Sequence, residues 1–164
     1  MDERDEGREA APRGLGMDGP AFLLAQVGAY ASGRFAQRLA EAGFTPPQAG
    51  ILRIVALDEG INQKALAERL GILPVRLVAL IDDLEGRGLV ERRRSAQDRR
   101  NHALHLTDAG TEALRSIGRL AQAHQADLCD GLSDAERTQL AQLLAKVAQH
   151  HGLARGVHPG FRRL

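Results

Sequence analysis

Arginines gather in one short stretch of this chain, between Arg92 and Arg100, which contains Arg92, Arg93, Arg94, Arg99 and Arg100. A guanidinium is planar, always charged and carries its N–H groups in a fixed fork, which suits phosphate oxygens and the edges of bases. Ala, Gly and Arg are abundant throughout, so GC-rich codon usage explains the high total of arginines. It does not explain why five of them lie in this cluster. The stretch therefore favours an anionic partner, although such a run taken alone is usually a solvated surface.

The overall composition gives less direction than this cluster. The chain has 164 residues and a net charge of +1, and its residues are 43% hydrophobic, 26% charged and only 3% aromatic. A core with so few aromatic side chains must be built from Leu, Ala, Val and Ile, which favours helices over a β-sandwich or barrel. A net charge this close to zero does not by itself indicate a nucleic-acid binder. The distribution of charge must carry that argument.

The sequence also predicts the compartment. No apolar run approaches the roughly 20 residues that a membrane-spanning helix needs, and residues 1–13 are charged and lack the apolar region of a signal peptide. A single cysteine, Cys129, excludes an intrachain disulfide framework. We expect a cytoplasmic protein with no membrane partner.

Apolar residues at helical spacing, together with helix-capping residues, predict a mainly helical chain. Thr45 and Gln48 form a capping box with Pro46 and Pro47 between them, and Ser133 and Glu136 form a second one. Gly71 ends a short helix that Asn62 caps. The expected helices begin near Pro20, Thr45, Asn62, Pro74, Thr107 and Ser133.

Between the fourth and fifth helices the apolar period changes. Residues 89–92 and 102–106 read as two short strands, and the polar residues between them predict a β-hairpin. A short helix, a turn at Gly71 and a second amphipathic helix form a helix-turn-helix, in which the second helix fits the major groove of DNA, about 12 Å wide. The hairpin that follows would be a wing. The fold class is thus mainly α with one β-hairpin, a winged helix-turn-helix flanked by terminal helices.

Three segments resemble the MarR (multiple antibiotic resistance regulator) family. They are LEGRGLVER at residues 84–92, DRR at residues 98–100 and LHLTDAG at residues 104–110. They are similar to that family's "LE-x-x-G-L-V", its wing "D-x-R" and its "L-T-x-x-G", and the order of helices agrees over about residues 19–151. The resemblance implies a homodimeric regulator, most often a repressor, that binds double-stranded DNA at a pseudo-palindrome. It also implies that small molecules or oxidants often control DNA affinity.

Composition predicts the two tails, and the resemblance implies the division of the residues between them. Residues 1–18 form a disordered tail, residues 19–44 a dimerisation helix and residues 45–106 the winged helix-turn-helix. Residues 107–151 form further dimerisation helices, and residues 152–164 an irregular tail. A dimer would hold two winged domains against one operator.

The expected DNA contacts lie on the wing and on two helix starts. By resemblance Arg100 enters the minor groove and Asp98 orients the wing, while Arg99 and residues 92–94 contact phosphates. Arg76 can reach a guanine edge or a phosphate near the start of the recognition helix, and the preceding helix presents its N–H groups to a phosphate. The full predicted set is Asn62, Gln63, Lys64, Pro74, Val75, Arg76, Arg92, Arg93, Arg94, Asp98, Arg99 and Arg100.

The recognition helix departs from the family pattern. Where the family usually carries Ser or Thr, this chain has Leu73, Pro74, Val75, Leu77 and Val78. Leu77, Leu80, Ile81 and Leu84 form the expected buried face, and Val75, Val78 and Ala79 are expected to face outward. Few polar side chains remain to read bases, so we expect specificity from Arg76, from apolar contact with thymine methyl groups and from groove shape.

Other functions receive less support from the residues. Tyr30, Phe35 and Leu52 could line an effector pocket, although core packing is the simpler interpretation. The histidines show no metal-ligand spacing, so no metal or cofactor is expected, and no catalytic motif predicts an enzyme. The alternatives are a winged-helix protein-interaction module without specific DNA reading, motivated by the apolar recognition helix, and a metal- or redox-responsive regulator that uses the histidines or Cys129.

Overall fold

The computed structural model describes residues 19–94, 102–154 and 156–157. Within them the chain is mainly helical with one antiparallel hairpin, as the sequence predicts. The elements in chain order are α1 (Pro20–Glu41), α2 (Pro46–Leu57), α3 (Gln63–Leu70), α4 (Pro74–Gly86), β1 (Val90–Arg94), β2 (His102–Leu106), α5 (Asp108–Leu128) and α6 (Asp134–His150).

The predicted caps start and end these helices. The Thr45 N–H donates to the Gln48 side chain at 2.8 Å, and the Thr45 hydroxyl accepts from the Gln48 N–H, which completes the capping box of α2. The Asn62 side chain accepts the Ala65 N–H at 2.9 Å at the start of α3. Gly71 ends α3 with φ 67°, a left-handed conformation that costs a side-chain-bearing residue free energy. This residue forms the turn of the helix-turn-helix.

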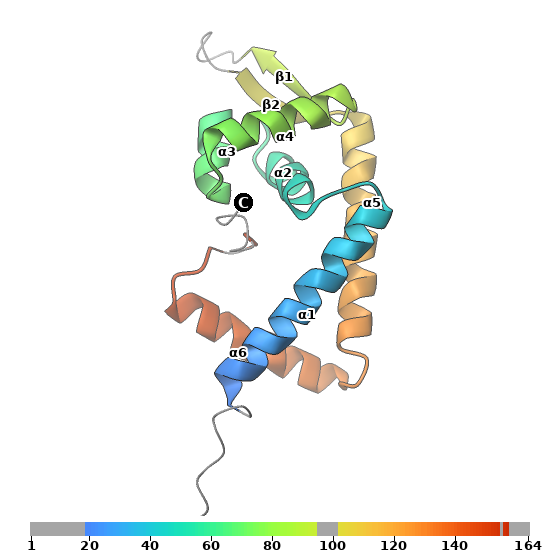
Figure 1. Cartoon of the computed structure of the whole chain (residues 1–164), viewed down its shortest axis with the longest axis vertical. Coiled ribbons are helices and arrows are strands. Elements are labelled where there is room, and N and C mark those ends of the chain that lie inside the picture. The colour runs from blue at the N-terminus through green and yellow to red at the C-terminus, as the bar shows by residue number, and fades with distance from the viewer. Residues whose placement is uncertain (1–18, 95–101, 155, 158–164) are drawn as a thin grey trace, which may run out of the picture. The chain divides into compact units, whose positions relative to one another are not determined.

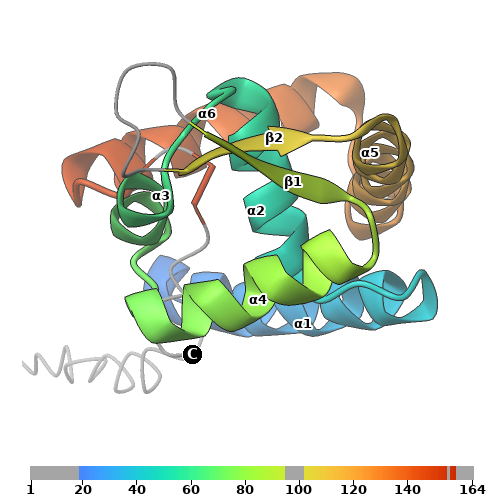
Figure 2. The ribbon, with the colours of Figure 1, turned by 90° about the horizontal axis from the view of Figure 1, so that it is seen from above.

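Helix α2 lies among α3, α4, β2 and α5 (Figures 1 and 2), and the hydrophobic core is centred on it. Ile51 and Leu52 of α2 are fully buried, and α3, α4, β2 and α5 supply apolar side chains around them. On α4 the expected inner face is confirmed, because Leu77, Ile81 and Leu84 are buried and Leu80 is partly buried against the core. The core thus fixes the direction in which the opposite face of α4 points.

The hairpin is longer than the apolar pattern predicts. Strand β1 continues to Arg94, which pairs with His102, while Val90 pairs with Leu106 at the other end. The other edge of β2 bonds to the segment before α3: the Leu104 N–H donates to the Ile61 carbonyl at 3.0 Å, and Asn62 forms an isolated bridge with Ala103. The wing is therefore joined by backbone hydrogen bonds to the start of α3.

A close backbone approach joins the start of α5 to the hairpin. A Cβ atom on Gly110 would lie 1.9 Å from the Leu89 carbonyl oxygen, so only glycine fits there. Thr107 caps α5 by accepting the Gly110 N–H at 2.9 Å, and its hydroxyl donates to the Gly88 carbonyl at 2.6 Å. This contact explains why a "T-x-x-G" sequence follows the second strand.

The described chain divides into two units, residues 19–34 and the residues from Phe35 onward, and the division falls within α1. In the first unit several large apolar side chains are exposed: Phe22, Leu23, Leu24, Val27 and Tyr30. In the second unit α6 has no buried residue, and it exposes Leu140, Leu143, Leu144 and Val147. None of the described helices is long and apolar enough to cross a membrane.

Candidate nucleic-acid interface

The outer face of α4 begins with an open helix terminus. No side chain caps the start of α4, and Pro74 at its first position has no N–H to donate. The N-terminal end of a helix carries a partial positive charge that favours anions. Val75 is 75% exposed, and Arg76, also exposed, makes no ion pair with any other described residue. This terminus can therefore receive a phosphate or a base edge.

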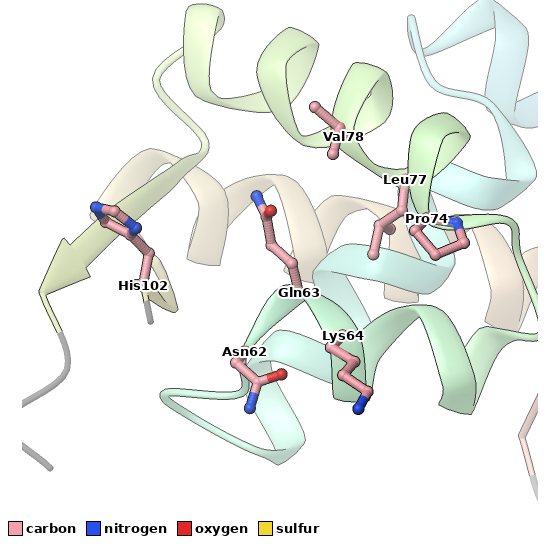
Figure 3. Close-up of a pocket in the computed structure, with 7 residues that line it drawn as sticks. All are labelled: Asn62, Gln63, Lys64, Pro74, Leu77, Val78 and His102. Atoms are coloured by element: carbon pink, nitrogen blue, oxygen red, sulfur yellow. The ribbon is translucent and has the colours of Figure 1, made fainter. Parts of the chain in front are cut away.

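The starts of α3 and α4 meet at one pocket of about 320 Å³ (Figure 3). Four predicted site residues line it: Asn62, Gln63, Lys64 and Pro74. Leu77 and Val78 of α4 and His102 of β2 complete the lining. Three elements, α3, α4 and β2, thus converge on one surface, which combines the exposed ammonium of Lys64 with the starts of two helices.

His102 was not among the predicted site residues. The sequence interpretation considered it only as a metal ligand, but it is exposed at the first position of β2, directly opposite Arg94. Strand alternation places His102 and Leu104 on one side of the hairpin. The sequence prediction ended the first strand at Arg92, which leaves His102 without a partner. The pairing of Arg94 with His102 was therefore not foreseen.

Arg92 lies within a network on the inner side of the wing. Its guanidinium donates to Glu85 and, at 2.5 Å, to Asp82, both on α4, while its backbone N–H donates to Glu85 at 3.2 Å. With its amide oxygen facing the guanidinium, Gln63 of α3 accepts from Nε and Nη2 of Arg92 at 2.9 and 3.0 Å. Arg92 thus links β1 to both helices of the helix-turn-helix.

The electrostatics of this network keep Arg92 charged. Its side chain is only 20% exposed, and this burial lowers the pKa of Arg92. The hydrogen bonds and negative charges of Asp82 and Glu85 outweigh that effect and hold the pKa above its ordinary value. The phosphate contact predicted for Arg92 would have to compete with these carboxylates.

The other arginines of β1 have different surroundings. Arg93 is exposed and pairs with Glu91 of the same strand, and Arg94 is exposed without an ion pair to any other described residue. Both can approach a phosphate without breaking contact with α4. Asp98, Arg99 and Arg100 lie outside the described residues.

The predicted effector-pocket residues have dissimilar environments. Leu52 is fully buried in the core, and Phe35 packs against that core with its ring centroid 5.3 Å from that of His124. Tyr30 belongs to the other unit and is 62% exposed. The effector pocket stays a prediction.

No metal site is evident in the described part of the chain, where no three His, Cys, Asp or Glu side chains gather as ligands. His105 Nδ1, on β2, lies 3.1 Å from a carboxylate oxygen of Glu59. Cys129 is half-buried at the end of α5.

Comparison with known proteins agrees with this arrangement. A model of the MarR family matches residues 42–101, which include the helix-turn-helix and the first strand of the hairpin. The transcriptional repressor CouR, in a structure bound to a 23-mer DNA duplex, is 34% identical, with a TM-score of 0.71 over 85% of this chain and 99% of that one. The chain belongs to the MarR family.

Further relatives of this MarR-family chain are named as regulators. A putative transcriptional regulatory protein for the hcr operon of Thauera aromatica is 36% identical over 64% of this chain and 63% of its own length, so the chain spans just under two thirds of that relative. The uncharacterised HTH-type transcriptional regulator YkoM of Bacillus subtilis (strain 168) is 31% identical over 67% of this chain and 71% of its own length.

CouR from Rhodococcus jostii RHA1 has also been solved bound to p-coumaroyl-CoA. That structure is 30% identical, with a TM-score of 0.65 over 80% of this chain and 92% of that one. The family and these relatives are transcriptional regulators and not enzymes. The fold and family of the chain are those of transcriptional regulators, one of which has been solved bound to DNA.

Proposed function

We propose that this chain is a homodimeric repressor that binds a pseudo-palindromic operator and is released from it by a small molecule. The convergence of the α3 and α4 starts, with the wing held against α4, is the observation that supports DNA binding most strongly. In this arrangement α4 enters the major groove and the hairpin approaches the neighbouring backbone. The cytoplasm, where chromosomal DNA lies in the bacterial relatives, is part of the proposal.

Different charged residues of this surface contact different parts of the DNA. Lys64 and the start of α3 contact the phosphate backbone of one DNA strand. Arg76, at the start of α4, contacts a phosphate or a guanine edge. Arg93 and Arg94, followed by Arg99 and Arg100 of the predicted wing, add phosphate and minor-groove contacts. Arg92 has a different role and positions the wing.

Dimerisation is supported by apolar surface on each unit. Leu143 of α6 is 52% exposed and Val147 is 45% exposed, and in the first unit Val27 is 50% exposed. Apolar surfaces of this kind on helices outside the core are typical of subunit interfaces. A two-fold dimer would space its half-sites about one helical turn apart, roughly 34–36 Å.

Release by a ligand is the part of the proposal that leans most on a relative. CouR has been solved bound to p-coumaroyl-CoA, and by analogy a small molecule would bind this chain. Such a ligand must bind one arrangement of the two winged domains better than the other, because equal binding shifts no equilibrium.

Footprinting on the DNA upstream of the chain's own gene tests this function. We expect protection of two symmetric half-sites with centres about 10 base pairs apart. Protection should disappear when Lys64 and Arg76 are both replaced by alanine. Absence of protection at about 0.1 M salt, where a binder of this kind retains affinity, would favour the protein-interaction module instead, and partner capture would follow.

A further inference from the structure

The exposed face of α4 is apolar at the end where a recognition helix reads bases. Leu73 is 66%, Val75 is 75% and Val78 is 42% exposed, and Ala79 beside them is also exposed. Val75, Val78 and Ala79 are three and four residues apart, so they share one face of the helix. The core residues Leu77, Ile81 and Leu84 occupy the opposite face. The apolar row is therefore a surface feature and not part of the core.

We propose that Val75 and Val78, together with Leu73, recognise thymine through its C5-methyl group in the major groove. This inference rests on the proposed DNA-binding function and adds the kind of base that is read. The residues of a recognition helix that reach base edges are those near its N-terminus, and Val75 occupies the second position of α4. Val78 follows one turn later on the same face.

The chemistry of the groove selects thymine. Thymine alone presents a methyl group in the major groove, whereas the other base edges present hydrogen-bond donors and acceptors. A valine placed against those polar edges removes their water without replacing its hydrogen bonds, which is unfavourable. Against a methyl group the same valine buries apolar surface on both partners. Binding of the apolar row to thymine is therefore more favourable than its binding to the other bases.

The charges around the row suit a DNA duplex. Lys64, at the start of α3, and Arg76, beside Val75, add positive charge to the open terminus of α4. The first carboxylate farther along the same face belongs to Asp82, which lies seven residues after Val75. Arg92 donates to that carboxylate at 2.5 Å and offsets its charge. The apolar row is thus bordered by cations and by a neutralised acid.

The experiment begins with duplexes selected by the full-length protein from a random library. In a selected duplex, each thymine is replaced singly by deoxyuridine, which removes only the methyl group. We expect thymine at one or more positions of each half-site, and a roughly fourfold loss of affinity at each methyl group that the protein buries. Replacement of thymines outside both half-sites is the matched DNA control and should have no effect.

Two variants link the effect to the proposed residues. Val75→Ala and Val78→Ala truncate exposed side chains on a helix that alanine favours, so folding is preserved. Each variant should bind the thymine duplex more weakly, lose sensitivity to deoxyuridine at one position, and keep the wild-type dependence on salt. Persistence of full deoxyuridine sensitivity in both variants would overturn the assignment to these residues.

The possible outcomes distinguish failure of the thymine inference from failure of the proposed DNA-binding function. If the protein selects no preferred duplex, both the DNA-binding proposal and the thymine reading are overturned. If it selects a duplex but deoxyuridine has no effect within the half-sites, the DNA-binding proposal stands and the methyl reading is overturned. Unchanged DNA affinity in the valine variants likewise overturns it and leaves a protein partner as the occupant of this row.

Discussion

At the scale of single residues, Arg92 and Arg93 are neighbours in sequence with different surroundings. Arg92 contacts carboxylates of α4 and the Gln63 amide of α3, while Arg93 is exposed and pairs only with a carboxylate of its own strand among the described residues. Exposed ion pairs of the second kind contribute little to stability, typically below about 1 kcal/mol. The two arginines therefore provide a matched comparison.

We expect Arg92→Ala to lower the free energy of unfolding by about 1–2 kcal/mol, because it leaves two neighbouring carboxylates without their donor. Arg93→Ala should change it by less than about 0.5 kcal/mol. Urea unfolding followed by circular dichroism measures both. Equal stability of the two variants would contradict the positioning role of Arg92.

The same two arginines should differ in how their removal changes the salt dependence of DNA binding. Loss of one phosphate contact lowers the slope of log affinity against log salt by roughly 0.9. We expect that reduction for Arg93→Ala. For Arg92→Ala we expect weaker binding with less change of slope, since its guanidinium is engaged inside the protein. A full reduction of slope for Arg92→Ala would instead assign it to a phosphate, as the sequence alone predicts.

At the scale of elements, the junction between the hairpin and α5 depends on one glycine. Gly110 and Gly118 both lie in α5, but a Cβ on Gly110 would meet the Leu89 carbonyl, whereas one on Gly118 would meet no atom within 4 Å. The helix propensity of alanine favours both replacements. Only the surroundings distinguish them.

Gly110→Ala should therefore destabilise the protein by about 1–3 kcal/mol through overpacking against backbone. Gly118→Ala should leave stability unchanged or raise it by up to roughly 1 kcal/mol. Thermal unfolding of the two variants beside the wild type measures the difference. A Gly110→Ala protein as stable as Gly118→Ala would show that α5 is not held by this contact.

The start of α6 makes the stability of the folded chain depend on pH. The Ser133 hydroxyl and backbone N–H both donate to the Glu136 carboxylate and hold the pKa of that carboxyl below its ordinary value of 4.5. A group whose pKa is lower in the folded state stabilises that state above its unfolded pKa, and the contribution is lost as pH falls through the folded pKa.

We expect Glu136→Gln to lower the Tm at pH 7 and to make less difference as the pH falls below about 4.5. Thermal unfolding of both proteins across pH 3–7 tests this expectation. A Tm difference that is constant over the whole range would contradict the capping role of the carboxylate.

The sequence predicted those features of the elements that depend on local residues. Caps such as Thr45 and Asn62 act within one helical turn, and the buried row of α4 follows from periodicity, so both were predictable. The bonds of Arg92 were not, because they join side chains from three elements whose juxtaposition requires the folded chain. The extension of β1 to Arg94 was missed because backbone pairing continues where the apolar pattern has stopped.

The candidate site was predictable to a similar extent. The residues at the start of α3 and α4 were expected from helix order, and the structure brings Lys64 and Pro74 to one pocket. His102 was missed because its place depends on the register of the hairpin. The effector pocket is still a prediction, since apolar residues such as Leu52 have the same pattern whether they fill a core or line a cavity.

At the scale of the whole molecule, the account requires two copies of the chain. Helix α6 has no buried residue and exposes a row of leucines, which is unfavourable in a monomer. We expect Leu143→Glu to convert the dimer to a monomer, because it places a charge in an apolar interface. Gln142→Glu adds the same charge at the adjacent exposed position and should leave the dimer intact. Sedimentation equilibrium distinguishes the two, and a dimer in Leu143→Glu would contradict the assigned interface.

The most direct test of DNA binding uses fluorescence anisotropy on the duplex upstream of the chain's own gene. Wild type, Arg76→Ala and Arg100→Ala are titrated at low and moderate salt against scrambled competitor, with Arg115→Ala on α5 as the control for loss of one arginine. The account predicts tight, competitor-resistant binding that the first two variants weaken by about 1–3 kcal/mol each and that the control retains. Weak binding that is equal on both duplexes and unchanged in every variant would contradict it.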